Sequence, residues 1–136
     1  FYASPQVSPQ DISEAAAMGM ALVVNNRPDG EAADQPEGAA IEAATRAAGM
    51  DYLAIPIGSA GFSEPQVERL QNALASAQGP VLGFCRSGTR STLLWSLAKA
   101  RSGGDPDAIA EAAAAVGYDV SPVRPAMDMF AARAAE

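Results

Sequence analysis

The sequence predicts an α/β fold of three layers, with a largely parallel sheet between two layers of helices. Short apolar runs alternate with longer helix-forming segments along the chain, and each run ends in turn-forming or polar residues. The length of 136 residues suits one compact core and is short for two ordinary domains. We therefore expect a single domain over residues 1–136, with ligands at the carboxyl ends of the strands.

Three short apolar runs are the predicted strands: residues 21–24, 52–57 and 81–84. The first run leads into the turn-forming segment 25–30, and its β-branched residues favour a central position in the sheet. The last run is followed at once by Cys85 and then by a helix-forming segment. This strand, loop and helix form the unit on which the functional prediction depends.

Capping residues mark the beginnings of several helices. Ser8-Pro9 with Asp11 predicts an N-cap, a proline at the first helical position and an acidic first turn. Ser63 with Gln66 three residues later is typical of a capping box. The predicted helices are residues 9–20, 35–48, 63–77, 89–100 and 106–116, and a final helix after residue 122.

Composition excludes several classes of protein. The net charge is −7, with 9 Lys and Arg against 16 Asp and Glu, which argues against a nucleic-acid partner. No apolar run is long enough to cross a membrane, so we expect a soluble protein. With no histidine and one cysteine, the chain has no internal disulfide and no His-activated nucleophile. A zinc site would have to be built from carboxylates and one thiolate, so we expect no metal catalysis and no cofactor. A free thiol suits the cytoplasm, although export stays open.

The segment from Cys85 to Ser91 predicts an anion-binding loop around a nucleophilic thiol. Backbone N–H groups between a strand and a helix can point at one spot, and the guanidinium groups of Arg86 and Arg90 also favour a thiolate. Gly88 allows a tight turn. By itself a lone cysteine is more often an inert, buried residue, and arginines are more often solvated surface charges. The predicted catalytic residues are Cys85, Arg86 and Arg90, and the predicted anion-binding residues of the loop are Ser87, Gly88, Thr89 and Ser91.

A second candidate segment, residues 26–31, follows the first strand. Its composition is also that of an ordinary turn. In the functional interpretation Arg27 adds positive potential to the cysteine pocket, and Asp29 orients an arginine or carries protons. Asn26, Arg27 and Asp29 are therefore included among the predicted substrate-binding residues.

Two resemblances refine these predictions. Residues 85–90 resemble the Cys-x-x-Gly-x-Arg loop of single-domain rhodanese-type sulfurtransferases. Almost the whole chain, including Ser4-Pro5-Gln6 and residues 26–31, resembles the phosphatase-like domain family DUF442, which occurs alone or fused to a β-lactamase-like hydrolase. The second resemblance implies a fold similar to dual-specificity and tyrosine phosphatases, with a mostly parallel sheet of four to five strands.

The chain departs from the tyrosine-phosphatase pattern in three ways. Those enzymes have five residues between cysteine and arginine, whereas four separate Cys85 from Arg90. They also place a histidine before the cysteine and an aspartate acid after the second strand, where this chain has Phe84 and residues 58–61, which contain no aspartate. Asp29 and Glu31 are the candidates to replace the missing acid.

The preferred interpretation is a rhodanese-like sulfurtransferase that passes sulfane sulfur through a Cys85 persulfide, because a short loop suits a single sulfur atom. The alternative is an atypical phosphatase with a Cys85 phosphocysteine intermediate, and the third is a non-catalytic anion-binding module. We expect a small anionic or sulfane-sulfur substrate and, by analogy with the fused relatives, a partner hydrolase that processes persulfides. We expect Met127 and Phe130 of the last helix to face inward. With Met129 on the same helix, two arrangements stay open: the helix packs on its own sheet, or it forms a dimer face.

Overall fold

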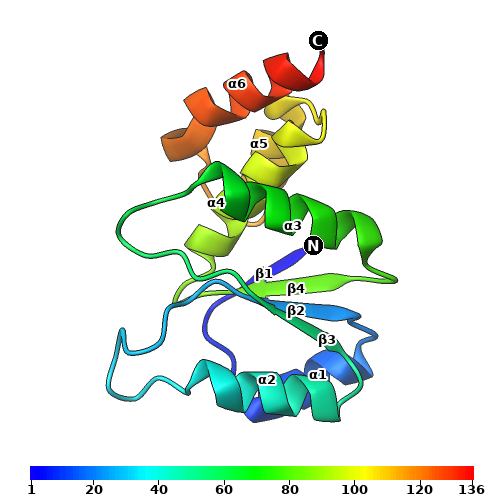
Figure 1. Cartoon of the computed structure of the whole chain (residues 1–136), viewed down its shortest axis with the longest axis vertical. Helices are drawn as coiled ribbons and strands as arrows, with labels where there is room; N and C mark the ends of the chain where they lie inside the picture. The colour runs from blue at the N-terminus through cyan, green and yellow to red at the C-terminus, as the bar shows by residue number, and fades with distance from the viewer. The chain divides into compact units, whose positions relative to one another are not determined.

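The computed structural model describes all residues from 1 to 136. It contains two compact units, residues 1–61 with 76–91 and residues 62–75 with 92–136, and Figure 1 shows their elements. The single domain that the chain length predicts stays a prediction. None of the helices combines the length and the apolar character that a membrane-spanning segment needs.

A four-stranded parallel sheet in the order β1-β4-β2-β3 organises the first unit. Its strands are β1 (Tyr2–Ser4), β2 (Leu22–Asn25), β3 (Asp51–Ala54) and β4 (Val81–Phe84). Asn25 lies opposite both Phe84 and Ala54, so the carboxyl ends of these three strands are level. The interior position of β2 and the parallel arrangement confirm the prediction, and the residues that follow β2 and β4 meet at one edge.

The edge strand β1 has no counterpart among the predicted strands. It is three residues long and partly exposed, so it lacks the apolar run that marks a buried strand. Tyr2 pairs with Leu82, and the ring of Phe1 lies where a Cβ on Gly83 would stand. Glycine in β4 therefore leaves room for the start of the chain against the sheet.

Helices α1 (Pro9–Ala17) and α2 (Gly38–Ala47) cover one face of this sheet, below it in Figure 1. The predicted capping box of α1 is present, with the Ser8 hydroxyl accepting from the Asp11 N–H and the Asp11 carboxylate accepting from the Ser8 N–H. The core of the unit is an apolar cluster of Val7, Ile12, Ala15, Met20, Val23, Ile41, Met50, Leu82 and Phe84. This core supports the strands whose ends form the site.

The second unit is helical. Its helices are α3 (Glu64–Ser76), α4 (Thr89–Arg101, whose first three residues belong to the first unit), α5 (Pro106–Ala115) and α6 (Arg124–Ala134), with a 3₁₀ turn at Ser121–Val123 before α6. Glu64 links three of them, because its carboxylate accepts from Arg101 of α4 and Arg133 of α6. Met127 and Phe130 are buried as predicted, whereas Met129 is exposed.

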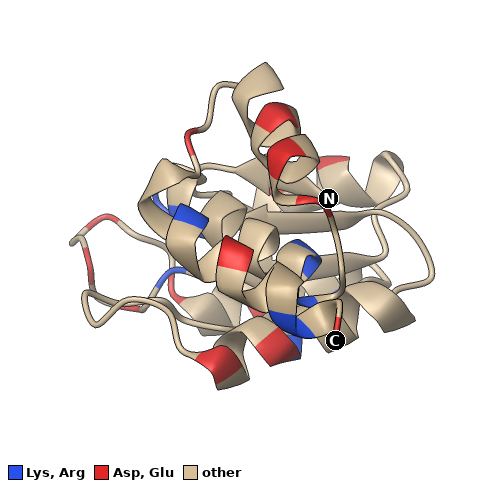
Figure 2. Cartoon of the chain, turned by 90° about the horizontal axis from the view of Figure 1, so that it is seen from above, with Lys and Arg blue, Asp and Glu red and all other residues tan.

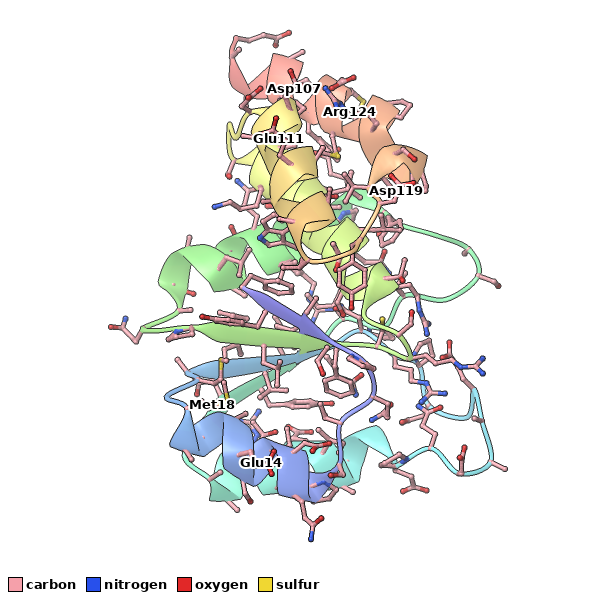
Figure 3. The ribbon with its side chains drawn as sticks, turned by 180° about the vertical axis from the view of Figure 1, so that it is seen from behind. Glu14, Met18, Asp107, Glu111, Asp119 and Arg124 are labelled. Carbon is pink, nitrogen blue, oxygen red and sulfur yellow. The ribbon has the colours of Figure 1, made fainter.

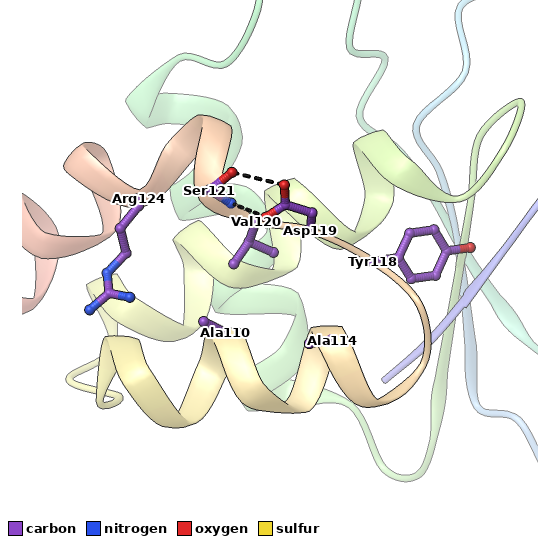
Figure 4. Close-up of a pocket in the computed structure, with 7 residues that line it drawn as sticks. All are labelled: Ala110, Ala114, Tyr118, Asp119, Val120, Ser121 and Arg124. Atoms are coloured by element: carbon purple, nitrogen blue, oxygen red, sulfur yellow. Dashed lines mark hydrogen bonds between the residues drawn. The ribbon is translucent and has the colours of Figure 1, made fainter.

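A pocket of about 410 Å³ opens in the second unit between α5 and the turn before α6 (Figure 4). Asp119 accepts from the Ser121 N–H and hydroxyl, both at 2.9 Å. Arg124 forms ion pairs with Asp107 and Asp128, and Figure 3 labels the first of these pairs. The charged groups of this pocket therefore have partners within the chain, and none of the predicted site residues lines it.

Candidate active site

Cys85 directly follows β4 and is fully buried. The N–H of Gly88 donates to its sulfur at 3.1 Å. Gly88 has φ of 91°, in the left-handed region that side chains other than glycine rarely adopt. The chain therefore turns back over the thiol before α4 begins at Thr89, and this turn presents a backbone donor to the sulfur.

Arg90 is held by three acceptors. Its two terminal nitrogens donate to the two oxygens of Glu31 at 2.7 and 2.9 Å, and Nη1 also donates to the Ile57 carbonyl at 2.8 Å. The hydrogen bond to Glu31 raises the pKa of Arg90, and the neighbouring Cys85 sulfur adds to this effect. Arg90 is thus a fixed cation beside the sulfur.

Glu31 binds a second arginine. Arg27 is almost fully buried and donates from Nε to Glu31 Oε1 at 3.0 Å. Hydrogen bonding to Arg90 is the largest cause that lowers the pKa of Glu31 to about 2, and Arg27 contributes to the same shift. Glu31 is therefore a carboxylate throughout the physiological pH range.

A chain of hydrogen bonds connects both ends of the cysteine loop. Arg27 Nη1 donates to Gln6 Oε1 at 3.0 Å, and the Gln6 N–H donates to the Arg86 carbonyl at 3.3 Å. Since Arg27 also binds Glu31, which binds Arg90, the chain runs from Arg86 at one end of the loop to Arg90 at the other. We call Gln6, Arg27, Glu31 and Arg90 the loop clamp.

Ser91 and Asn26 form a buried polar pair beneath the loop. The Ser91 hydroxyl donates to Asn26 Oδ1 at 2.7 Å, and Asn26 Nδ2 donates to the Ile55 carbonyl at 2.9 Å. Ser91 is one of the predicted anion-binding residues, but its hydroxyl proton is directed to Asn26, so both residues serve to hold the first turn of α4 against the ends of β2 and β3.

Asp29 has a structural role at the start of α2. Its Oδ1 accepts from the Gly38 N–H at 2.8 Å and so caps α2, whose N-cap residue Glu37 provides no side-chain cap. This explains why α2 begins later than the predicted residue 35. A pocket of about 260 Å³ lies beside Asp29 and Tyr52. Asp29 makes no hydrogen bond to an arginine, so the predicted role in orienting one is not what its contacts provide.

The remaining loop residues face solvent. Ser87 donates from its hydroxyl to Thr89 Oγ1 at 3.1 Å, which stiffens the tip of the loop. The Arg86 side chain is exposed and takes part in no hydrogen bond or ion pair. Arg86 is therefore connected to the loop clamp only through its backbone carbonyl, and its guanidinium is not part of the clamp.

Two members of the loop clamp were absent from the predicted site residues. Glu31 entered only as a candidate acid, and because residues 27–31 form a turn, the spacing of four residues from Arg27 to Glu31 does not by itself predict their ion pair. Gln6 lies after β1, a strand that the apolar pattern does not reveal. Both residues lie close to the cysteine loop only because the order of the strands in the sheet brings them there.

Solved structures identify the class of fold to which this protein belongs. Kinase-associated phosphatase, crystallised with its catalytic-site cysteine replaced by serine, aligns with a TM-score of 0.76. The alignment covers 98% of this chain and 85% of that one, with 14% identity, and shows the fold. The protein has a tyrosine-phosphatase-like α/β fold, as predicted.

The family can also be named. Residues 1–102 match the family described as beta-lactamase hydrolase-like protein, phosphatase-like domain, and the chain belongs to it. A beta-lactamase hydrolase-like protein of Agrobacterium fabrum is 38% identical over 93 residues, which are 68% of this chain and 22% of that protein. The chain thus spans about a fifth of the length of this relative.

A related structure supports the same family. A candidate phosphatase from Neisseria meningitidis aligns with a TM-score of 0.79 and 32% identity, over 93% of this chain and 90% of that one. The predicted DUF442 family is confirmed. The resemblance of the short loop to rhodanese remains an interpretation of the sequence.

Proposed function

We propose that this domain hydrolyses phosphomonoesters through a Cys85 phosphocysteine. The observation that carries the proposal is the hydrogen bond of 3.1 Å from Gly88 to the Cys85 sulfur, formed beside the fixed guanidinium of Arg90. A backbone donor and a cation at the sulfur favour the thiolate, which is the reactive form of a thiol. The likeness to phosphatase structures of the same fold supports a phosphoryl group as the electrophile.

The reaction has two steps. The thiolate attacks phosphorus, so that an S–P bond forms while the ester P–O bond breaks, and the leaving oxygen departs with the electron pair. Water then attacks the phosphocysteine, the S–P bond breaks, and inorganic phosphate leaves with the thiolate restored. Arg90 and the loop amides stabilise the charge on the equatorial oxygens in both steps.

Neither carboxylate considered as the acid is suited to protonate the leaving group. Glu31 has a pKa of about 2 and is paired with two arginines, so it carries no proton at neutral pH. Asp29 accepts the Gly38 N–H as a helix cap. The proposed substrates are therefore phosphates whose leaving group departs as an anion, such as aryl phosphates.

Sulfur transfer is the second candidate, and the length of the loop favours it. Four residues separate Cys85 from Arg90, and the terminal nitrogens of Arg90 already bind Glu31 and Ile57. A persulfide needs no tetrahedral cradle and no acid. In this reaction the thiolate attacks the outer sulfur of thiosulfate and sulfite leaves; cyanide then removes that sulfur as thiocyanate.

A paired assay separates the two candidates. Wild type and Cys85→Ser would be given an aryl phosphate in one reaction, and thiosulfate with cyanide in another. Phosphate release that Cys85→Ser abolishes, with no thiocyanate, is the result we expect. Cysteine-dependent thiocyanate with no phosphate release would instead assign the domain to sulfur transfer.

Compartment and partner are proposed on chemical grounds. A free thiol that must stay reduced suits the cytoplasm. Because relatives of this chain are several times longer, we also propose that the domain works beside a hydrolase domain. If sulfur transfer is the reaction, that hydrolase would consume a persulfide.

A further inference from the structure

Arg86 differs from the other cations of the first unit. Arg27 and Arg90 are paired with Glu31, and Arg46 is paired with Glu42 at 3.0 Å. The guanidinium of Arg86 has no such partner, although the chain carries 16 acidic residues. Figure 2 shows how sparsely Lys and Arg are placed among the acidic residues. An unpaired arginine is thus a rare feature here, and it directly follows the nucleophile.

The backbone at Arg86 is fixed, so the position of its side chain relative to Cys85 is limited. The Arg86 carbonyl accepts from the Gln6 N–H, and the Cys85 N–H donates to the Ser4 carbonyl, both at 3.3 Å. Both contacts tie the start of the loop to the end of β1 and the residues that follow it. The exposed guanidinium therefore extends from an anchored point next to the sulfur.

The balance of charges around the cysteine loop also points to Arg86. Of the three arginines in or beside the loop, Arg27 and Arg90 share the single Glu31 carboxylate, whereas Arg86 has no carboxylate partner. The thiolate that the proposed mechanism requires would balance one more positive charge, which leaves one positive charge in excess, and Arg86 is the arginine without a partner. A guanidinium that is free to use its fork binds carboxylates and phosphates in a bidentate manner.

We propose that Arg86 forms a second anion subsite beside Cys85, so that preferred substrates carry another anionic group close to the reacting phosphate. This rests on the proposed phosphatase function for its substrate, but the subsite itself can be tested without turnover. Arg90 and the loop amides bind the reacting phosphate, and Arg86 binds the second anionic group of the substrate.

The first experiment compares alkylation of Cys85 by iodoacetate and by iodoacetamide. Both reagents form the same S–C bond with loss of iodide, but only iodoacetate brings a carboxylate. We expect Arg86→Gln to lower the ratio of the iodoacetate rate to the iodoacetamide rate by about three- to tenfold, as loss of a steering charge does. Arg86→Lys should keep most of the ratio. Arg46→Gln removes the same charge from an exposed helix and should leave the ratio unchanged.

The second experiment measures substrate choice. Two phosphotyrosine peptides share one leaving group, and the phosphotyrosine is flanked by glycines in one and by aspartates in the other. Wild type should prefer the acidic peptide in kcat/KM, and Arg86→Gln should reduce this preference by about tenfold. Thermal melting of each variant checks that the fold is kept.

Each outcome decides a separate point. An alkylation ratio that Arg86→Gln leaves unchanged overturns the subsite, whatever the peptides show. A lowered ratio with no peptide hydrolysis by wild type supports the subsite and contradicts the phosphatase function. A lowered ratio with an unchanged peptide preference overturns the assignment to substrate choice. A wild-type Cys85 that reacts with neither reagent overturns both proposals, since each requires an accessible thiolate.

Discussion

Glu31 binds Arg90 through both carboxylate oxygens, at 2.7 and 2.9 Å, although the two residues are 59 positions apart in the chain. The same carboxylate accepts from Arg27. One acidic side chain thus positions the arginine of the cysteine loop and neutralises a buried cation, and most of the predictions below concern this arrangement or the loop that it holds.

Replacing Glu31 by glutamine should lower kcat/KM by about ten- to hundredfold, because an unheld Arg90 loses the geometry that the transition state needs. The comparison uses steady-state kinetics with an aryl phosphate. Glu42→Gln breaks a matched ion pair, with Arg46 on exposed α2, and should leave the rate unchanged. Equal losses in both variants would mean that the effect of Glu31 is not local.

Stability should fall in acid through Glu31. Its pKa is about 2 in the folded protein against an ordinary value of 4.5, so the folded state binds its proton less readily than the unfolded chain. The stabilisation is complete above about pH 4.5 and is lost as the pH falls toward 2. Urea unfolding at a series of pH values should show a smaller decline in this range for Glu31→Gln. An identical decline in the two proteins contradicts the prediction.

Asn26→Ala should lower the free energy of unfolding by about 2 kcal/mol, since it leaves the buried Ser91 hydroxyl and the Ile55 carbonyl without this partner. Ser91→Ala should cost less, because it frees only one acceptor on Asn26. The double variant should be less destabilised than the sum of the two single variants. Strict additivity in urea unfolding would show that the pair is not coupled.

Gly88→Ala should reduce both stability and activity. A side chain at φ of 91° costs about 1–2 kcal/mol, and relief of that strain moves the N–H away from the Cys85 sulfur. Gly49→Ala is the matched control, since Gly49 follows α2 with φ of 85° and has nothing within 4 Å of an added Cβ. The control should lose similar stability and retain full activity in the aryl phosphate assay.

Aryl phosphates should react more slowly as the pKa of the leaving phenol rises, because neither Glu31 nor Asp29 is placed to supply a proton. Alkyl phosphates should be slower than aryl phosphates by about 10² to 10⁴. A plot of log kcat/KM against phenol pKa tests this. A flat dependence would mean that an acid protonates the leaving oxygen.

The unit around β4 could be predicted closely from sequence. The strand at Val81–Phe84 and the start of α4 at Thr89 match the predicted boundaries, because an apolar run and a glycine-containing turn are local signals. The parallel sheet and the interior position of β2 also followed from alternating strands and helices. In contrast, β1 and the role of Asp29 as the cap of α2 had no local signal.

The sequence alone therefore determined which segments are buried, where most helices begin and which residue is the candidate nucleophile, since these depend on neighbours within a few positions. Only the tertiary structure decided which side chains hold the loop. Glu31 meets Arg90 and Asn26 meets Ser91 because β4 lies beside β2 and their carboxyl ends are level. Contacts across separate strand ends are set by strand order, and the spacing of residues along one segment does not encode that order.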